Sequence, residues 1–194
     1  MINLKEKKIL VTGASGFLGS HIVGGLLQRG VPRKNIFTPS SQECDLRKRE
    51  DCSKAVSGCE IVFDCAVLAG DLLLRSKMPG KVFYENLMMG TQLLDAARQE
   101  DVEKFITMGS AVEYSEQAPS PLKEGDVWLG LPTEVNLPYS LARKAVLIQG
   151  QLYRKQYGFH AIHILSTNIY GPGERLESGY VMPSLIHKIL IFFH

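Results

Sequence analysis

A chain of 194 residues, of which 45% are hydrophobic, has enough apolar material for one substantial core and the start of a second. Its 22 basic and 20 acidic residues nearly balance, so a formal charge of +2 indicates neither nucleic acid nor an anionic membrane as a partner. No apolar stretch is long enough to cross a membrane and the N-terminus is polar, so we expect a cytoplasmic protein.

The spacing of cysteines and histidines argues against a disulfide framework and against a metal site. No cysteine belongs to a paired C-x-x-C arrangement, which indicates reduced thiols at Cys44, Cys52, Cys59 and Cys65. Four histidines lie in helix or strand patterns, and their spacing is not that of metal ligands: His21, His160, His163 and His187. We therefore expect no metal.

The first recognisable motif joins a short apolar strand to a helix. Residues 9–11 form the predicted strand, a helical apolar pattern resumes at residues 20–27, and between them lie Gly13, Gly16 and Gly19 in the spacing G-x-x-G-x-x-G. The first glycine permits a tight turn, the second lets the backbone approach a pyrophosphate, and the third lets the helix pack on the strand. The N–H groups at the helix N-terminus suit an anion. A flexible loop is the alternative, but the flanking strand and helix disfavour it.

The segment after the second predicted strand, residues 35–38, bears on which dinucleotide binds. An NAD site usually has an acidic residue about 20 residues past the glycines, which binds the ribose hydroxyls. Here the first acid after Thr38 is Glu43. Two hydroxyls and two cations stand nearby in the sequence: Ser40, Ser41, Arg33 and Lys34. The pattern favours NADP over NAD, unless the serines are only turn residues.

The rest of the chain alternates strand-like and helical segments. Further strands are predicted at residues 61–70, 104–108 and 160–166, and further helices at residues 82–99 and 139–157. This alternation, from residue 8 to about 170, predicts an α/β fold, a Rossmann-type doubly wound parallel sheet with helices on both faces. Asp45 is a candidate to bind the adenine edge. Asn86 is either a satisfied helix side chain or one that orients groups near the site.

Several motifs, taken in order, resemble the extended short-chain dehydrogenase/reductase family of NAD-dependent epimerases and dehydratases. They are the glycine motif, Ala66 after a strand, Ser110 four residues before Tyr114, Tyr139 with basic residues one turn later, and Thr167-Asn168-Ile169-Tyr170-Gly171-Pro172. Within the family, the GDP-L-fucose synthases are the most similar branch, on Ser40-Ser41 with Asp45-Leu46, on residues 154–158 and on residues 181–186.

The resemblance implies hydride transfer between a nicotinamide and C4 of a nucleotide sugar, with Tyr139 as proton donor or acceptor and Ser110 bonded to the same oxygen. A tyrosine with a pKa near 10 needs a neighbouring cation to favour its phenolate at neutral pH. Arg143 and Lys144 are the candidates for this catalytic role.

A cofactor site and a substrate site follow from the motifs and the resemblance together. The predicted cofactor-binding residues are Gly13, Ala14, Ser15, Gly16, Phe17, Leu18, Gly19, Ser40, Ser41, Asp45, Leu46, Ala66, Met108, Gly109, Ser166, Thr167, Asn168 and Ile169. The predicted substrate contacts are Asn168, Tyr180 and Lys188.

The chain departs from the family pattern at its basic residue. The family has lysine four positions after the tyrosine, where this chain has Arg143. A planar guanidinium is not a positional copy of an ammonium, and Lys144 points about 100° away around the helix. We expect weakened rather than abolished chemistry.

A second departure concerns epimerisation. Val112 and Tyr180 occupy the positions at which fucose synthases have a cysteine and a histidine that invert C3 and C5. This disfavours the epimerase half of that activity and favours a 4-keto sugar reductase. A sugar-nucleotide C4 epimerase and a non-catalytic dinucleotide-binding fragment remain as alternatives.

The third departure is length, since family members continue into a lobe that closes over the nucleotide sugar. We expect residues 1–172 to form the NAD(P)-binding domain and residues 173–194 to begin a substrate-binding lobe that is largely absent from this chain. Because the family often dimerises through the helix that carries the tyrosine, a homodimer is expected.

Overall fold

The computed structural model describes residues 2–68, 72–174, 176 and 180–192. Its strands are β1 (Ile9–Thr12), β2 (Ile36–Phe37), β3 (Ile61–Asp64), β4 (Lys104–Ser110) and β5 (Ala161–Ser166). Its α-helices are α1 (Phe17–Gln28), α2 (Arg49–Val56), α3 (Leu72–Lys77), α4 (Pro79–Gln99), α5 (Leu137–Tyr157) and α6 (Val181–Phe192). Short 3₁₀ turns are η1 (Leu4–Glu6), η2 (Arg33–Asn35), η3 (Ala111–Glu113) and η4 (Glu124–Trp128).

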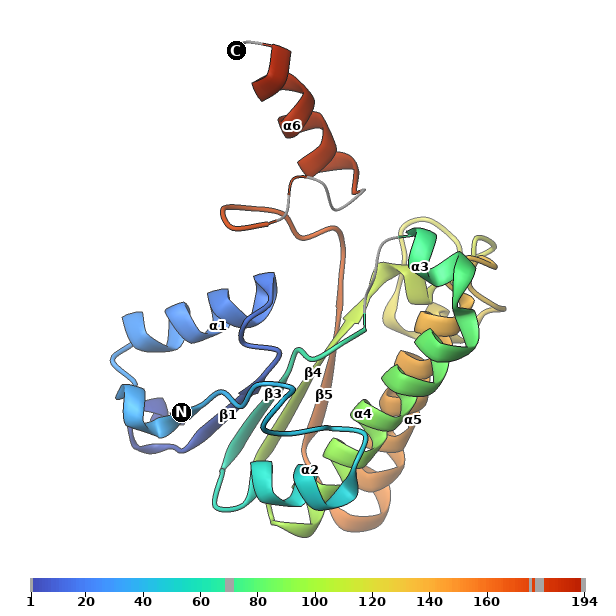
Figure 1. The fold of residues 1–194 in the computed structure, drawn as a ribbon. Coiled ribbons are helices and arrows are strands. Elements are labelled where there is room, and N and C mark those ends of the chain that lie inside the picture. The colour runs from blue at the N-terminus through green and yellow to red at the C-terminus, as the bar shows by residue number, and fades with distance from the viewer. Residues whose placement is uncertain (1, 69–71, 175, 177–179, 193–194) are drawn as a thin grey trace.

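The five strands form one parallel sheet in the order β2-β1-β3-β4-β5. Helix α1 lies on one face, and α2, α4 and α5 lie on the other (Figure 1). The predicted Rossmann-type sheet is confirmed. The strand order reverses between β1 and β3, which makes their carboxyl ends the expected ligand-binding edge of such a sheet.

The side chains of the strands divide the core in two. Ile9, Val11 and Ile61 pack beneath α1, whereas Leu10 and Val62 pack toward the α4 and α5 face with Leu93, Leu94, Phe105 and Val146. This alternation is what period-two side-chain geometry gives in a strand that is buried on both faces.

The strand predicted over residues 61–70 is shorter in the structure, where β3 ends at Asp64. The backbone N–H groups of Cys65 and Ala66 donate to the Thr12 hydroxyl at 3.1 Å each. They therefore leave the strand ladder, and the chain turns beside the glycine motif. Residues 69 and 70 of the predicted strand lie outside the described residues.

Helix α6 projects beyond the carboxyl ends of the strands, away from the rest of the molecule (Figure 1). Its apolar side chains are largely exposed, with Val181 at 68% and Phe192 at 85%. Within the described residues, no helix combines the length and the apolar character needed to span a bilayer.

The four cysteines are free thiols, and burial protects them. Burial raises the pKa of Cys52 and of Cys65 to about 12, that of Cys59 to about 11, and that of Cys44 above its ordinary value. Because only the thiolate reacts, we expect these thiols to react with Ellman's reagent at pH 8 roughly 100-fold more slowly in the native protein than in guanidinium chloride. The absorbance of the released chromophore measures both rates. A rapid phase from any native thiol would contradict this prediction.

Candidate active site

The glycine motif turns sharply at the carboxyl end of β1. Gly13 has φ +63°, and a Cβ there would lie 2.7 Å from the Cys65 carbonyl oxygen. A Cβ at Gly19 would collide with the Gly13 carbonyl oxygen, where α1 crosses the end of β1. The predicted reasons for these two glycines agree with the geometry: a left-handed turn at Gly13 and a close backbone approach at Gly19.

The N-terminus of α1 fits an anion. Gly16 is its N-cap residue and makes no side-chain cap, the first turn contains no acidic residue, and both Ser15 and Gly16 are exposed. Backbone N–H groups and the helix dipole therefore favour a negative group here. The predicted residues Ala14, Phe17 and Leu18 lie in this same turn, each partly buried.

The segment that begins with η2 and continues past β2 contains an arginine and a carboxylate that each bond to nearby groups. One nitrogen of Arg33 donates to the Ile36 carbonyl, and the other donates to the Thr38 hydroxyl at 3.1 Å. The Ser40 hydroxyl and N–H both donate to Glu43, at 2.7 and 2.8 Å, and these bonds lower the pKa of Glu43. The exposed Ser41 follows. Arg33 thus stands at the predicted ribose-phosphate end, while Ser40 is bonded to an acid.

Asp45 is engaged with a neighbouring arginine. Its carboxylate accepts from the Arg47 Nε at 2.8 Å and from Nη2 at 2.9 Å, which lowers the pKa of Asp45 to about 2. Leu46, the next predicted cofactor residue, is buried in the core with α2 and α4. Adenine contact by this pair stays a prediction.

Ser110 ends β4 and begins a tight turn. Its hydroxyl accepts from the Val112 N–H at 3.4 Å, and its N–H donates to the Glu113 carboxylate at 2.8 Å. Glu113 is fully buried and contacts His163 Nε2 at 3.1 Å. The acid that follows Ser110 is therefore held inside the fold.

Tyr139 stands on the first turn of α5, one residue before a contact that fixes this helix against the Ser110 turn. The Ser140 hydroxyl donates to the Val112 carbonyl at 2.8 Å. Tyr139 is only 7% exposed, and burial raises its pKa above the ordinary value of 10, an effect that the positive charges of Arg143 and Arg75 oppose. The predicted Ser110 and Tyr139 thus come from segments that the fold brings together.

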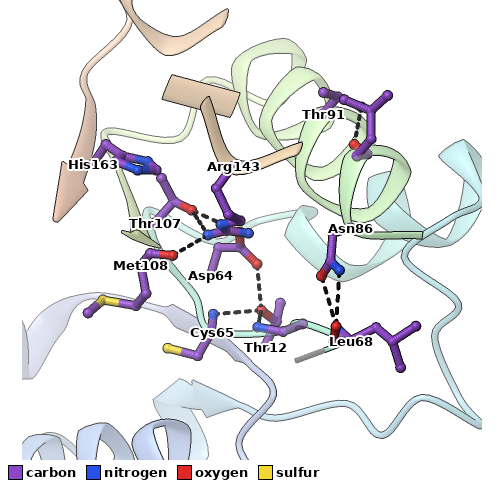
Figure 2. Close-up of polar contacts among 12 residues, drawn as sticks. Thr12, Asp64, Cys65, Leu68, Asn86, Thr91, Thr107, Met108, Arg143 and His163 are labelled. Atoms are coloured by element: carbon purple, nitrogen blue, oxygen red, sulfur yellow. Dashed lines mark hydrogen bonds and ion pairs between the residues drawn. The ribbon is translucent and has the colours of Figure 1, made fainter. Parts of the chain in front are cut away.

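Arg143 and Lys144 take different environments. The Arg143 guanidinium is buried, forms an ion pair with Asp64 at 3.4 Å, and donates to the Met108 carbonyl at 2.6 Å (Figure 2). Lys144 is also buried, which lowers its pKa, while the negative charge of Glu113 opposes that shift. The two basic residues are therefore not interchangeable in this fold.

Asn86 fixes the segment that follows β3. Its side-chain oxygen accepts from the Leu68 N–H at 2.9 Å, and its amide donates to the Leu68 carbonyl at 3.1 Å (Figure 2). Of the two interpretations of Asn86, a satisfied side chain and an orienting one, the structure supports both, since its bonds hold backbone next to the glycine motif.

The remaining predicted residues divide into bonded and exposed ones. The Ser166 hydroxyl donates to the Gly109 carbonyl at 3.1 Å, which joins the ends of β5 and β4. The exposed ones are Thr167, Asn168 and Ile169 after β5, and Tyr180 and Lys188 at and within α6. They lie beyond the carboxyl end of the sheet or on α6.

Arg75 is a candidate site residue that the sequence patterns do not indicate. It comes from α3, and its guanidinium lies 4.8 Å from the centroid of the Tyr139 ring. It donates to the Asn136 side chain at 2.7 Å and contacts the Tyr180 hydroxyl at 3.4 Å. It therefore connects α3, the start of α5 and the start of α6 around the tyrosine. The only sequence signal is a basic residue in a segment of little periodicity.

We expect Arg75→Met to raise the pKa of Tyr139 further, because it removes a positive charge that favours the phenolate. The alkaline absorbance titration near 295 nm, taken as the parent minus Tyr139→Phe, measures this pKa in each background. Arg75→Lys keeps the charge and is the matched control. Equal titrations for the parent and Arg75→Met would contradict the assignment.

The parallel sheet, the glycine turn at its switch point and the adjoining serine and tyrosine define a Rossmann-type protein of the short-chain dehydrogenase/reductase class. The model of the NAD dependent epimerase/dehydratase family matches residues 9–191, and the chain belongs to this family.

Curated relatives match nearly the whole chain. A GDP-L-fucose synthase from Sinorhizobium fredii is 31% identical over 192 residues, which cover 97% of this chain and 60% of the relative. A probable GDP-L-fucose synthase 1 from Oryza sativa subsp. japonica is 32% identical over 190 residues, which cover 95% of this chain and 57% of the relative. The chain thus spans less than two thirds of the length of these relatives.

Among solved structures, a GDP-mannoheptose C4 reductase from Campylobacter jejuni with NADP bound has a TM-score of 0.89 and 28% sequence identity. The match covers 96% of this chain and 56% of that one. The resemblance to the extended short-chain dehydrogenase/reductase family is confirmed, and so is the similarity to its fucose synthase branch.

Proposed function

We propose that this chain is the cofactor-binding part of an NADP-dependent sugar-nucleotide oxidoreductase that reduces a 4-keto sugar, similar to the GDP-L-fucose synthases. The observation that carries the proposal is the Ser140 bond to the Val112 carbonyl, 2.8 Å long. It holds the first turn of α5, with Tyr139, against the turn that Ser110 begins. Both hydroxyl residues then stand beside the edge of the sheet that carries the glycine motif.

The chain's own groups suit the two phosphate-bearing parts of NADP. The N-terminus of α1 and the Gly13 turn hold the pyrophosphate, and Arg33 beside Thr38 meets the ribose phosphate. When bound, the reduced nicotinamide supplies the hydride that reduces the sugar. The relatives named for GDP-sugar chemistry, one of them with NADP bound, support this assignment.

In the proposed reaction, Ser110 donates a hydrogen bond to the C4 oxygen and Tyr139 delivers the proton that this oxygen takes up. A tyrosine ordinarily keeps its proton at neutral pH, and burial, which raises the pKa of Tyr139, favours the protonated form further. A protonated Tyr139 is the state that reduction of a ketone requires.

The site offers poor groups for epimerisation at C3 and C5. Val112 has no titratable side chain, and the nearby Glu113 is buried and paired with His163. Reduction without epimerisation is therefore the favoured activity.

The test is oxidation of NADPH, followed at 340 nm, with a GDP-4-keto-6-deoxy sugar as the substrate. The proposal predicts consumption of NADPH and a product with a hydroxyl at C4 and unchanged configuration at C3 and C5. A dinucleotide that stays bound through purification, with interconversion of C4 epimers and no net oxidation, would favour a C4 epimerase instead. Binding of NADPH without turnover of any keto sugar nucleotide would favour a non-catalytic fragment.

Arg33→Gln tests the ribose-phosphate end of the site. Loss of a charged hydrogen-bond donor to phosphate should weaken NADPH binding about ten-fold and leave NADH binding nearly unchanged. The enhancement of nicotinamide fluorescence measures both affinities. Arg29→Gln, at the C-cap of α1 four residues before Arg33, is the matched surface control. An unchanged NADPH to NADH ratio would assign the discrimination to other residues.

Residues 173–194 belong, in this proposal, to the start of a second lobe that completes the sugar site. The exposed Tyr180 and Lys188, and the apolar surface of α6, are the groups that such a lobe would share with the substrate. The nucleotide sugar is the proposed substrate, and a second copy of the chain is the proposed partner.

A further inference from the structure

A row of polar side chains crosses the sheet just below its ligand-facing edge. Nearer the amino ends of the strands, four apolar residues pair across the sheet on the face that α4 and α5 cover: Leu10, Val62, Phe105 and Ala161. Two residues further along each strand, the register partners are all polar: Thr12, Asp64, Thr107 and His163. Since side chains two apart share a face, the polar row lies on the side of α4 and α5, directly above the core.

Asp64 is the centre of this row. Its two carboxylate oxygens accept from the hydroxyls of Thr12 and Thr107, at 3.0 Å each. Thr12 in turn accepts the N–H groups of Cys65 and Ala66, which fold the chain back beside Gly13. Asp64 is buried, so no ligand reaches its carboxylate, and its bond to Thr12 connects it to the glycine motif.

Arg143 closes the row from the helix side (Figure 2). Its guanidinium pairs with Asp64, donates to the Thr107 hydroxyl, and donates to the Met108 carbonyl at 2.6 Å. Both side chains of the ion pair are only 1% exposed. Gly90 of α4 leaves the space for α5, because a Cβ there would lie 3.7 Å from Arg143 Nη1 and against Val146.

The buried charges make the two residues interdependent. A buried carboxylate or guanidinium without its partner is strongly destabilising, whereas removal of both charges together costs far less. The Arg143 charge is committed to Asp64, and Arg143 lies four residues, one helical turn, after Tyr139. In the family, position 143 holds a cation beside the reacting groups. In this chain, the cation at that position, Arg143, instead attaches α5 to the sheet.

We propose that Arg143 is a positioning residue, which together with Asp64 fixes the Tyr139 turn of α5 against the strand ends that carry the glycine motif. This Asp64–Arg143 clamp deepens the proposed function, on which it rests. It predicts that Asp64, which no ligand can touch, affects dinucleotide binding as much as Arg143 does.

The experiment measures the thermal midpoint and the NADPH affinity of four proteins: the parent, Asp64→Asn, Arg143→Met and the double variant. Each single variant should lose about 10 °C. Each should also bind NADPH about ten-fold more weakly. In the double variant, the drop in midpoint and the loss of binding free energy should each be clearly smaller than the sum of the two single-variant losses. Val56→Ala, a core truncation at the end of α2, should lower the midpoint and leave the NADPH affinity within about two-fold.

Direct contact between Arg143 and the cofactor predicts a different pattern. Arg143→Met would then weaken NADPH binding, while Asp64→Asn would free the guanidinium and leave binding unchanged or tighter. That pattern would overturn the proposal. So would a double variant whose losses of midpoint and of NADPH affinity equal the sum of those of the two single variants. Unchanged NADPH affinity in both single variants at reduced stability, as in Val56→Ala, would also overturn it, because the pair would then be structural only.

Two conservative variants keep the test decisive if a single variant fails to fold. Arg143→Lys keeps a charge near Asp64 and should retain more affinity than Arg143→Met. Thr107→Val removes the hydroxyl that joins the pair and should weaken NADPH binding about three-fold. Parent-like NADPH binding by Thr107→Val would count against the clamp. If the parent binds no dinucleotide, the proposed function fails, and the additivity of the midpoints alone decides whether the pair exists.

Discussion

Gly19→Ala should weaken NADPH binding at least about 100-fold, because its Cβ would occupy the space of the Gly13 carbonyl oxygen. The methyl group forces α1 away from the end of β1. The N–H groups at the N-terminus of α1 then move relative to the Gly13 turn, and the two parts of the phosphate cradle no longer converge. Fluorescence titration of the reduced nicotinamide measures the loss.

Gly24→Ala is the matched control for this substitution. It adds the same methyl group to the same helix, but nothing lies within 4 Å of the new Cβ. It should stabilise α1 by about 1 kcal/mol, through helix propensity, and leave NADPH affinity unchanged. Equal affinities for Gly19→Ala and the parent would show that the phosphate binds elsewhere.

Tyr139→Phe should lower the rate of keto-sugar reduction about 10³-fold, within the usual range for loss of a general acid, and leave NADPH affinity within about two-fold. The phenyl ring still fills the same buried position beneath Arg75, so the fold and the cofactor site persist. The rate is measured as NADPH oxidation at saturating cofactor, and the affinity by fluorescence.

Tyr153→Phe is the control on the same helix. Its hydroxyl donates to Asp95 at 2.8 Å, away from the glycine motif, so its loss should reduce stability by about 1 kcal/mol without changing the rate. If Tyr139→Phe and Tyr153→Phe reduce the sugar equally fast, Tyr139 is not the proton donor.

The sequence predicts those parts of the fold that depend on local patterns. Apolar runs and the glycine spacing give the strand, turn and helix around Gly13, because Gly13 and Gly19 stand where the backbone leaves no room for a side chain. The same patterns overextend the strand over residues 61–70. Its end at Asp64 depends on the Thr12 hydroxyl, a partner 52 residues away in the sequence.

Side-chain partners explain the rest of what the sequence does not predict. Ser40 looks available for a phosphate, yet its hydroxyl donates to Glu43 three residues later. Arg143 looks like a substitute for lysine beside Tyr139, yet a carboxylate on a distant strand determines where its guanidinium lies. Arg75 belongs to a short helix without a clear pattern, so only the assembled fold shows it over the tyrosine ring.

The most direct test of the proposed cofactor site is titration of the chain with NADPH and with NADH, followed by the fluorescence of the reduced nicotinamide. We expect enhancement with both dinucleotides and binding of NADPH at least about ten-fold tighter, because in the proposed site α1 holds the pyrophosphate and Arg33 meets the additional phosphate. Failure of the chain to bind either dinucleotide, or tighter binding of NADH, would contradict this expectation.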